Sequence, residues 1–368
     1  MVSVKTAAAL LLGAVATLAL KATFGLVSTP HGCVLFQTSL VFLAMALLLP
    51  VHYFAAWALH WKPAKRVNRA ELLRLWRPAA VDVLATALAM GGLVHLSPST
   101  HKLLQYSVMP IVAVIRWALT KNSAATRGLV LYLVAIVVVV VSALYRDPAT
   151  ADEAPLGLLL LGASCVVQSV LFLVDADTTG RLPPLVGIGI QGLWGCFFLT
   201  AIVFPAAYII PTGSGPLENV VGVAQVVAGD PQLLASVLTT VVATTGFHVC
   251  AVQVLRDEST DYDYGYVLAI GLAPVVWAVG IIIDYVTAVP LDEEWVSWSS
   301  GLQLLGMALL VYATTVVHAD APELPVGVGH RVFTFSAPDA TEPALVQRLV
   351  AYGSFKASDH KTRGAFVI

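Results

Sequence analysis

The stretch Gly128-Leu-Val-Leu-Tyr-Leu-Val-Ala-Ile-Val-Val-Val-Val-Val-Ser-Ala-Leu-Tyr145 contains no charged residue, and it lies between Arg127 and Arg146. At a rise of 1.5 Å per helical residue such a run spans about 27 Å, close to the roughly 30 Å hydrocarbon core of a bilayer. The run does not alternate between apolar and polar residues, as a transmembrane β-strand does. It therefore predicts a transmembrane helix at about residues 126–145.

The composition of the whole chain agrees with this interpretation. Its 368 residues are 58% hydrophobic and 11% charged, and the mean hydropathy is +0.84, whereas soluble domains average about 45–50% apolar and about 25% charged residues. Similar apolar runs with short polar breaks recur from Thr6 to His318. We therefore expect an all-α integral membrane protein with ten transmembrane helices, at about residues 6–26, 32–59, 79–97, 99–120, 126–145, 155–174, 185–210, 231–255, 264–287 and 295–318.

The first apolar run has an alternative interpretation, because Lys5 ahead of an Ala/Leu-rich core is also typical of a cleaved secretory signal. Its length and the lack of a clear small-x-small cleavage site favour a transmembrane helix. If the N-terminus is cytosolic, sixteen of the twenty basic residues lie on the cytosolic side. The positive-inside rule therefore predicts that both termini are cytosolic.

Soluble catalysis and metal binding have no sequence signal here. The four cysteines all fall inside predicted helices without metal-ligand spacing, which indicates packing residues and not a disulfide framework or a zinc site; they are Cys33, Cys165, Cys196 and Cys250. There is no nucleotide-binding loop and no nucleophile–base constellation in a soluble segment. We expect no enzyme and no cofactor, with a membrane-embedded enzyme as the remaining alternative.

Short internal matches indicate two related halves. Leu10-Leu-Leu-Gly-Ala14 is repeated as Leu159-Leu-Leu-Gly-Ala163, Pro110-Ile-Val as Pro274-Val-Val, and Gly128-Leu as Gly301-Leu. Because each half has five helices, an odd number, the halves would be inverted relative to each other, which is the geometry of alternating access. The expected parts are a first repeat at 1–145, a luminal loop at 146–154, a second repeat at 155–318 and a flexible cytosolic tail at 319–368.

Two motifs in the helix expected at 185–210 resemble a known family. They read Gln191-Gly192-Leu-Trp-Gly195 and Pro205-Ala-Ala-Tyr208-Ile-Ile-Pro211-Thr-Gly213, followed by Leu217-Glu218. They are similar to the Glu-Gly-x-x-Gly helix and the Pro-x-x-Tyr-Ile-Pro-x-Gly segment of the drug/metabolite transporter superfamily, within it the F branch of solute carrier family 35. Gln191 stands where that family usually has glutamate, so a coupling role of that carboxylate does not carry over.

The helix expected at 99–120 carries a third resemblance. The family pattern Ser-x-x-Gln-x-Leu-Arg-x-Ser-Val compares with Ser99-x-x-Lys102-Leu-Leu104-Gln105-Tyr-Ser107-Val108 here. Near Ala273 the family often has an arginine, which this chain lacks. The resemblance implies a ten-helix transporter of organic solutes in a eukaryotic membrane, in a superfamily that includes nucleotide-sugar carriers. It does not extend to residues 319–368.

Several polar residues inside the predicted helices form a candidate anion site. Gln105 and Tyr106 follow Lys102 at i+3 and i+4, and therefore share a helix face. Lys21 and Asp284 reach a similar luminal depth, which predicts a site for a substrate carboxylate or phosphate with Asp284 as counter-ion when the site is empty. The alternative is that these long side chains reach water or pair structurally.

Gln191 and His248 complete the candidate substrate-binding residues, although a lone intramembrane histidine is often only hydrogen-bonded to a neighbouring helix. We expect Arg116 to anchor its helix at the cytosolic interface. Asp82 is expected to be interfacial as well.

These observations predict a transporter of a small, anionic organic metabolite in an endomembrane of the Golgi, lysosome or vacuole, with no nucleic-acid partner and an open question of homodimerisation. A non-transporting scaffold with the same fold is the alternative, and it would explain the altered positions Gln191, Lys102 and Ala273. In the tail, Tyr352-Gly-Ser-Phe355 has the tyrosine-x-x-bulky pattern that sorting adaptors bind.

Overall fold

The computed structural model describes residues 4–27, 33–58, 69–108, 110–112, 114–115, 126–145, 154–175, 182–212, 215–256, 264–286, 291, 293, 295 and 297–320. Arg116, the loop at 146–153 and the sorting pattern at Tyr352–Phe355 lie outside these residues. Within them the chain is mostly helical, and the helices are α1 (Val4–Leu26), α2 (Val34–Ala46), α3 (Leu48–Ala58), α4 (Arg69–Arg74), α5 (Trp76–His95), α6 (Pro98–Gln105), α8 (Thr126–Leu144), α9 (Ala154–Asp175), α10 (Pro184–Phe198), η1 (Leu199–Val203), α11 (Phe204–Ile209), α12 (Val220–Gly229), α13 (Pro231–Arg256), α14 (Tyr264–Val286) and α15 (Ser297–Asp320). The strands β1 (Pro211–Thr212) and β2 (Gly215–Pro216) form a short antiparallel pair.

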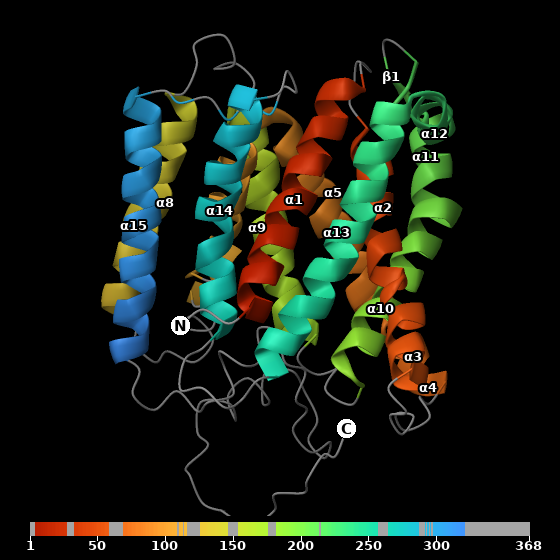
Figure 1. The fold of residues 1–368 in the computed structure, drawn as a ribbon, viewed down its shortest axis with the longest axis horizontal. Coiled ribbons are helices and arrows are strands. Elements are labelled where there is room, and N and C mark those ends of the chain that lie inside the picture. The colour runs from red at the N-terminus through yellow and green to blue at the C-terminus, as the bar shows by residue number, and fades with distance from the viewer. Residues whose placement is uncertain are drawn as a thin grey trace, which may run out of the picture.

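Six segments of the described chain are helices long and apolar enough to cross a membrane: Val4–Leu26, Val34–Ala58, Leu72–His95, Ala154–Leu171, Pro184–Ile209 and Pro231–Val254. Further apolar helical segments are shorter, and they lie in α8, α12, α14 and α15. The protein is therefore an α-helical membrane protein, as its composition predicts. Figure 1 shows most of these helices running side by side, with α12 seen end-on beside the strand pair.

Prolines explain why some predicted helices are divided. A proline has no N–H to donate, and its ring clashes with the carbonyl four residues earlier. The helix expected at 32–59 is interrupted at Leu47, three residues before Pro50, and so becomes α2 and α3. The helix expected at 185–210 widens into the π-helix η1 just ahead of Pro205. A π-helix has hydrogen bonds between residues five apart, and it usually occurs as a one-turn bulge within an α-helix.

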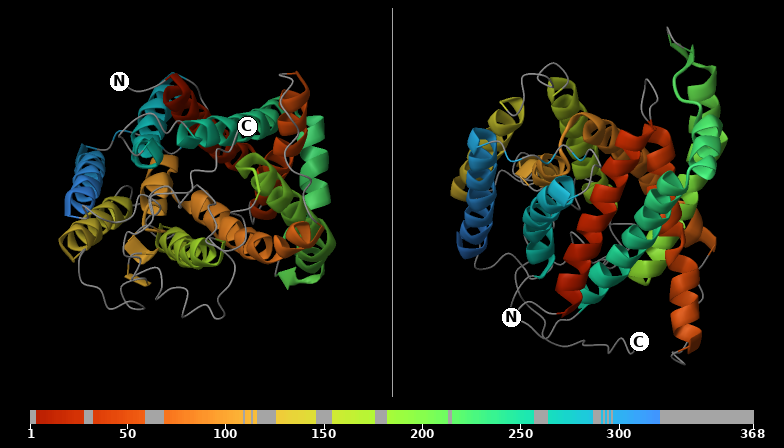
Figure 2. Two further views of the ribbon diagram at one scale, coloured as in Figure 1. Left: turned by 90° about the horizontal axis from the view of Figure 1, so that it is seen from below. Right: turned by 45° about the horizontal axis from the view of Figure 1, so that its top comes forward.

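Four pairs of helices make the most extensive contacts: α1 with α13, α5 with α9, α8 with α15, and α2 with α10. The α8–α15 pair lies at one edge of the bundle in both views of Figure 2. Two serines join this pair reciprocally, because the Ser142 hydroxyl donates to the Ser299 carbonyl at 2.7 Å and the Ser299 hydroxyl donates to the Ser142 carbonyl at 3.0 Å. Such hydroxyl bonds between helices are typical of packing in lipid, where apolar side chains gain little by leaving the solvent.

The face of α10 that meets α2 and α3 carries glycines. A Cβ added at Gly189 would lie 2.6 Å from the Leu49 side chain of α3, and one added at Gly192 would overlap the backbone of α2 at Met45 and Ala46. Because backbone atoms cannot move aside as a flexible side chain can, Gly192 fixes the closest approach of the two helices. The Gly192-x-x-Gly195 part of the family-like motif therefore has a packing role.

We expect Gly192→Ala to destabilise the protein by about 1–3 kcal/mol, the usual range for overpacking. The check is the melting temperature of the purified full-length protein in detergent. Gly187→Ala on the same helix is the matched control, since a Cβ there meets no atom within 4 Å and alanine favours helix by about 1 kcal/mol. Equal melting temperatures for the two variants would contradict the close approach of α2 and α10.

Candidate functional site

Lys21 binds the end of a neighbouring helix. Its ammonium donates to the carbonyls of Leu93 at 3.2 Å, Val94 at 3.0 Å and Leu96 at 3.1 Å. The last carbonyls of a helix lack helical hydrogen-bond partners and carry a partial negative charge. A buried ammonium there donates hydrogen bonds to these carbonyls, and its positive charge is stabilised by theirs. The structure thus places Lys21, which was expected in the anion site, on the C-terminus of α5.

Lys102, Gln105 and Tyr106 lie at the last turn of α6, and all three are half-buried. The Lys102 ammonium donates to Gln105 Oε1 at 3.0 Å, which confirms that the two share a helix face. The structure therefore brings three of the predicted residues together at the end of α6.

The α-helix is interrupted directly after these residues, and helical structure resumes at Val108. The amides of Tyr106 and Ser107 bond to carbonyls only three residues back, at 3.3 and 2.9 Å, so the helix tightens and α6 ends. Two side chains of α9 satisfy carbonyls around the break, because Cys165 Sγ donates to Leu104 at 3.7 Å and the Ser169 hydroxyl donates to Val108 at 3.2 Å.

Carbonyls at the break therefore face protein, as expected for a helix interrupted near Pro110. By contrast, α14 continues through Pro274. The supporting residues Cys165 and Ser169 were not predicted as such from the sequence, because neither forms part of a motif.

His248 and Asp284 have local partners. His248 Nδ1 lies 2.8 Å from the Thr244 carbonyl one turn earlier on its own helix, not on a neighbouring helix as expected. The Asp284 carboxylate accepts a hydrogen bond from the Leu291 backbone at 3.3 Å. Asp284 therefore links the last turns of α14 to Leu291.

Gln191 pairs with a carboxylate. Its side-chain amide donates to Asp82 Oδ2 at 2.9 Å, and the Thr86 hydroxyl donates to Asp82 Oδ1 at 3.3 Å. Both Asp82 and Gln191 are buried, so this pair lies inside the helix bundle. The family-like motif on α10 is thus divided: Gln191 bonds to α5, whereas the glycines that follow contact α2.

A second buried carboxylate was missed entirely from the sequence. Glu293 is 0% exposed, and it accepts bonds from the Ser99 backbone N–H and, at 2.8 Å, from the Ser99 hydroxyl. Gln303 of α15 donates from Nε2 to the same hydroxyl oxygen. The only sequence signal is the short acidic run after Leu291, which resembles an ordinary polar loop.

Glu218 makes a comparable contact at α2. Its carboxylate accepts from the backbone N–H groups of Leu35 and Phe36, both at 2.8 Å. Burial raises the pKa of this carboxyl, and the two backbone bonds oppose that rise. Leu217, the preceding residue of the family-like segment, is held by the carbonyls of Ala207 and Ile210, so the chain after α11 is folded back to deliver Glu218 to α2.

Some buried polar atoms in the described part of the chain have no hydrogen-bond partner: Gln37 Oε1, His101 Nδ1, Thr240 Oγ1 and Thr244 Oγ1. Such atoms are rare in proteins and usually mark water or a ligand. A separate apolar cavity of about 110 Å³ lies beside the α6 break, where Leu104, Ser107, Gly162 and Cys165 contribute to its lining. The residues searched contain no group of three His, Cys, Asp or Glu side chains suited to a metal ion.

We expect Gln191→Leu to destabilise the protein by about 1–3 kcal/mol, because it removes a donor from a buried carboxylate without changing side-chain volume much. Thermal unfolding of the full-length protein is the measurement. Adding Asp82→Leu should restore part of the loss, since both polar groups are then gone, while Gln225→Leu at an exposed position of α12 should change little. An unchanged melting temperature in Gln191→Leu would mean that the pair contributes nothing.

No protein-family model matches this chain, and a search of curated proteins found no match. A solved structure described only as "Crystal structure of protein" is 16% identical to it; the match covers 87% of this chain and 99% of the other, with a TM-score of 0.43. That similarity is too low to carry an argument about this protein's fold or function.

Proposed function

We propose that the protein transports a small organic anion by alternating access, and that Lys102 binds the substrate carboxylate or phosphate. The observation that carries the proposal is the environment of this ammonium. Among the described residues its hydrogen-bond partner is the neutral Gln105 amide. A cation inside a helix bundle with a neutral partner lacks charge compensation, which an anionic substrate would supply.

Keeping a charged lysine inside a helix bundle costs free energy. Ionisable residues within membrane segments are rare, and they generally serve a substrate or ion pathway. Tyr106, about one helical turn after Lys102, adds a hydroxyl group that suits an organic anion. The unpartnered His101 Nδ1, one residue before Lys102, is a further hydrogen-bonding group in this segment.

The finer architecture belongs to the same proposal. It comprises ten transmembrane helices in two inverted repeats, 1–145 and 155–318, with both termini cytosolic in an endomembrane, as the resemblance to the F branch of solute carrier family 35 implies. The break after α6 supports it, because interrupted helices commonly form transporter binding sites. The competing proposal is a scaffold protein that keeps this fold without transport.

The test is uptake of nucleotide sugars, nucleotides and organic anions into proteoliposomes that contain the full-length protein. We expect Lys102→Ala to lower uptake of the transported anion at least about tenfold, since a hydrogen bond to a charged group contributes about 1.5–3 kcal/mol. Lys5→Ala, which alters a lysine on an exposed position of α1, is the matched control and should leave uptake unchanged.

The outcomes separate the alternatives. Uptake that Lys102→Ala does not reduce would keep the transporter and remove the anion site from Lys102. If correctly folded protein takes up none of the panel, the scaffold becomes the better interpretation.

A further inference from the structure

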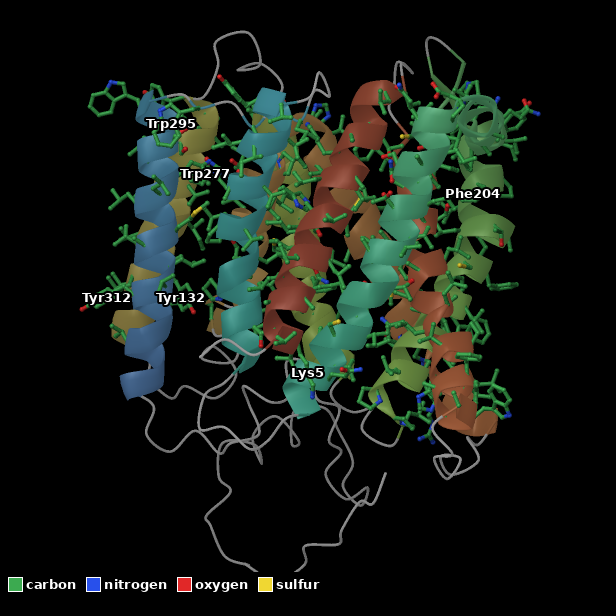
Figure 3. The ribbon with its side chains drawn as sticks, in the orientation of Figure 1. Lys5, Tyr132, Phe204, Trp277, Trp295 and Tyr312 are labelled. Atoms are coloured by element: carbon green, nitrogen blue, oxygen red, sulfur yellow. The ribbon has the colours of Figure 1, made fainter. Side chains whose placement is uncertain are left out.

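The connection between α14 and α15 inserts a carboxylate into one end of the bundle. Glu293 is fully buried, and its side chain packs on Gly280 of α14, where an added Cβ would lie 2.8 Å from Glu293 Cγ. Two residues later the ring of Trp295 lies 5.6 Å from that of Trp277 on α14. Figure 3 shows Trp295 at the end of the bundle opposite Lys5, which is the expected luminal end.

The hydrogen bonds around Ser99 favour the ionised form of Glu293. Gln303 donates its amide hydrogen to the Ser99 hydroxyl oxygen, so the single hydroxyl hydrogen of Ser99 is available for Glu293 Oε2. The backbone N–H of Ser99 donates to Glu293 Oε1. Both carboxylate oxygens are therefore acceptors, and an ionised carboxylate accepts such bonds more strongly than a protonated acid does.

This contact joins three elements at the N-terminus of α6. Ser99 belongs to α6, Gln303 to α15, and Glu293 to the connection that follows α14. A carboxylate at a helix N-terminus is stabilised by the unpaired N–H groups and the helix dipole, and both contributions weaken when the charge is neutralised. Protonation would thus weaken the hold of Glu293 on the start of α6.

Glu293 stands between Asp292 and Glu294 in the sequence, and the neighbouring helices carry further charged or titratable groups. Lys21 of α1 binds the carbonyls of Leu93 to Leu96 just before α6, and His95 is at the end of α5. On α14, Asp284 bonds to Leu291. Lys102 follows Ser99 by three residues on α6, about one helical turn, so movement of Ser99 would also move Lys102.

We infer that Glu293 is a proton-binding site that closes this end of the bundle when ionised and opens it when protonated, so that a proton is the co-substrate of anion transport. This inference rests on the proposed function for its link to transport. The opening step itself can be measured without a substrate.

The experiment is the rate at which a maleimide labels a cysteine introduced by Leu96→Cys, in the full-length protein reconstituted in liposomes. Leu96 is buried between α5 and α6, so labelling reports opening. Trp298→Cys at an exposed position corrects for the pH dependence of the thiol. We expect the corrected rate to rise about tenfold from neutral to acidic pH, and to be fast and independent of pH when Glu293→Gln is added.

A corrected rate in Leu96→Cys that does not change with pH would overturn the inference, and so would a pH dependence that survives Glu293→Gln. If Glu293→Gln does not fold, Ser99→Ala serves instead: it removes one bond but keeps the carboxylate on the Ser99 N–H, so labelling should be faster at neutral pH yet still rise in acid. Unchanged labelling in Ser99→Ala would also contradict the contact.

Transport is measured separately for every panel anion that the wild type takes up. A pH gradient should increase accumulation by the wild type but not by Glu293→Gln, whereas exchange of internal for external anion should persist in both. Uptake that no pH gradient affects would reject proton coupling and leave the proposed transporter intact. Absence of any uptake with pH-dependent labelling would reject the transporter and the coupling, but not the proton-binding site.

Discussion

The structure depends on hydrogen-bond partners for the unpaired backbone N–H and carbonyl groups at helix ends, because water is scarce inside a membrane. At the corner between α5 and α6, one helix ends and another begins within a few residues, which leaves unpaired carbonyls beside unpaired N–H groups. Lys21 supplies the positive charge for the carbonyls of α5, and Glu293 supplies the negative charge for the N-terminus of α6. Each charge is opposite in sign to the helix end that it meets, so both can be buried. The pair therefore supplies partners for backbone groups that lipid could not satisfy.

The same constraint operates elsewhere in the bundle. Glu218 serves the N-terminus of α2, and Cys165 and Ser169 serve carbonyls beside the end of α6. In each case the side chain comes from a segment distant in sequence. Interruptions of the helices are therefore also the points at which distant parts of the chain are joined.

The distance in sequence between these contact partners explains what could and could not be predicted from the sequence. Hydropathy and length identified the helical segments, because both are local properties, and spacing of three residues was enough to pair Lys102 with Gln105. The partners of Lys21 and Gln191 could not be derived, since a single sequence carries no information on which helices adjoin. Glu293 was missed because an acidic residue between two apolar runs looks the same whether it faces water or folds inward.

The glycine face of α10 closes the space between two helices. A Cβ added at Gly192 would overlap the backbone of α2 at Met45 and Ala46, so the two helices touch there through their main chains. No water file can thread that seam, and the two helices form a single wall. In the transporter proposed above, the solute would pass elsewhere, on the side of the bundle where α6 carries Lys102.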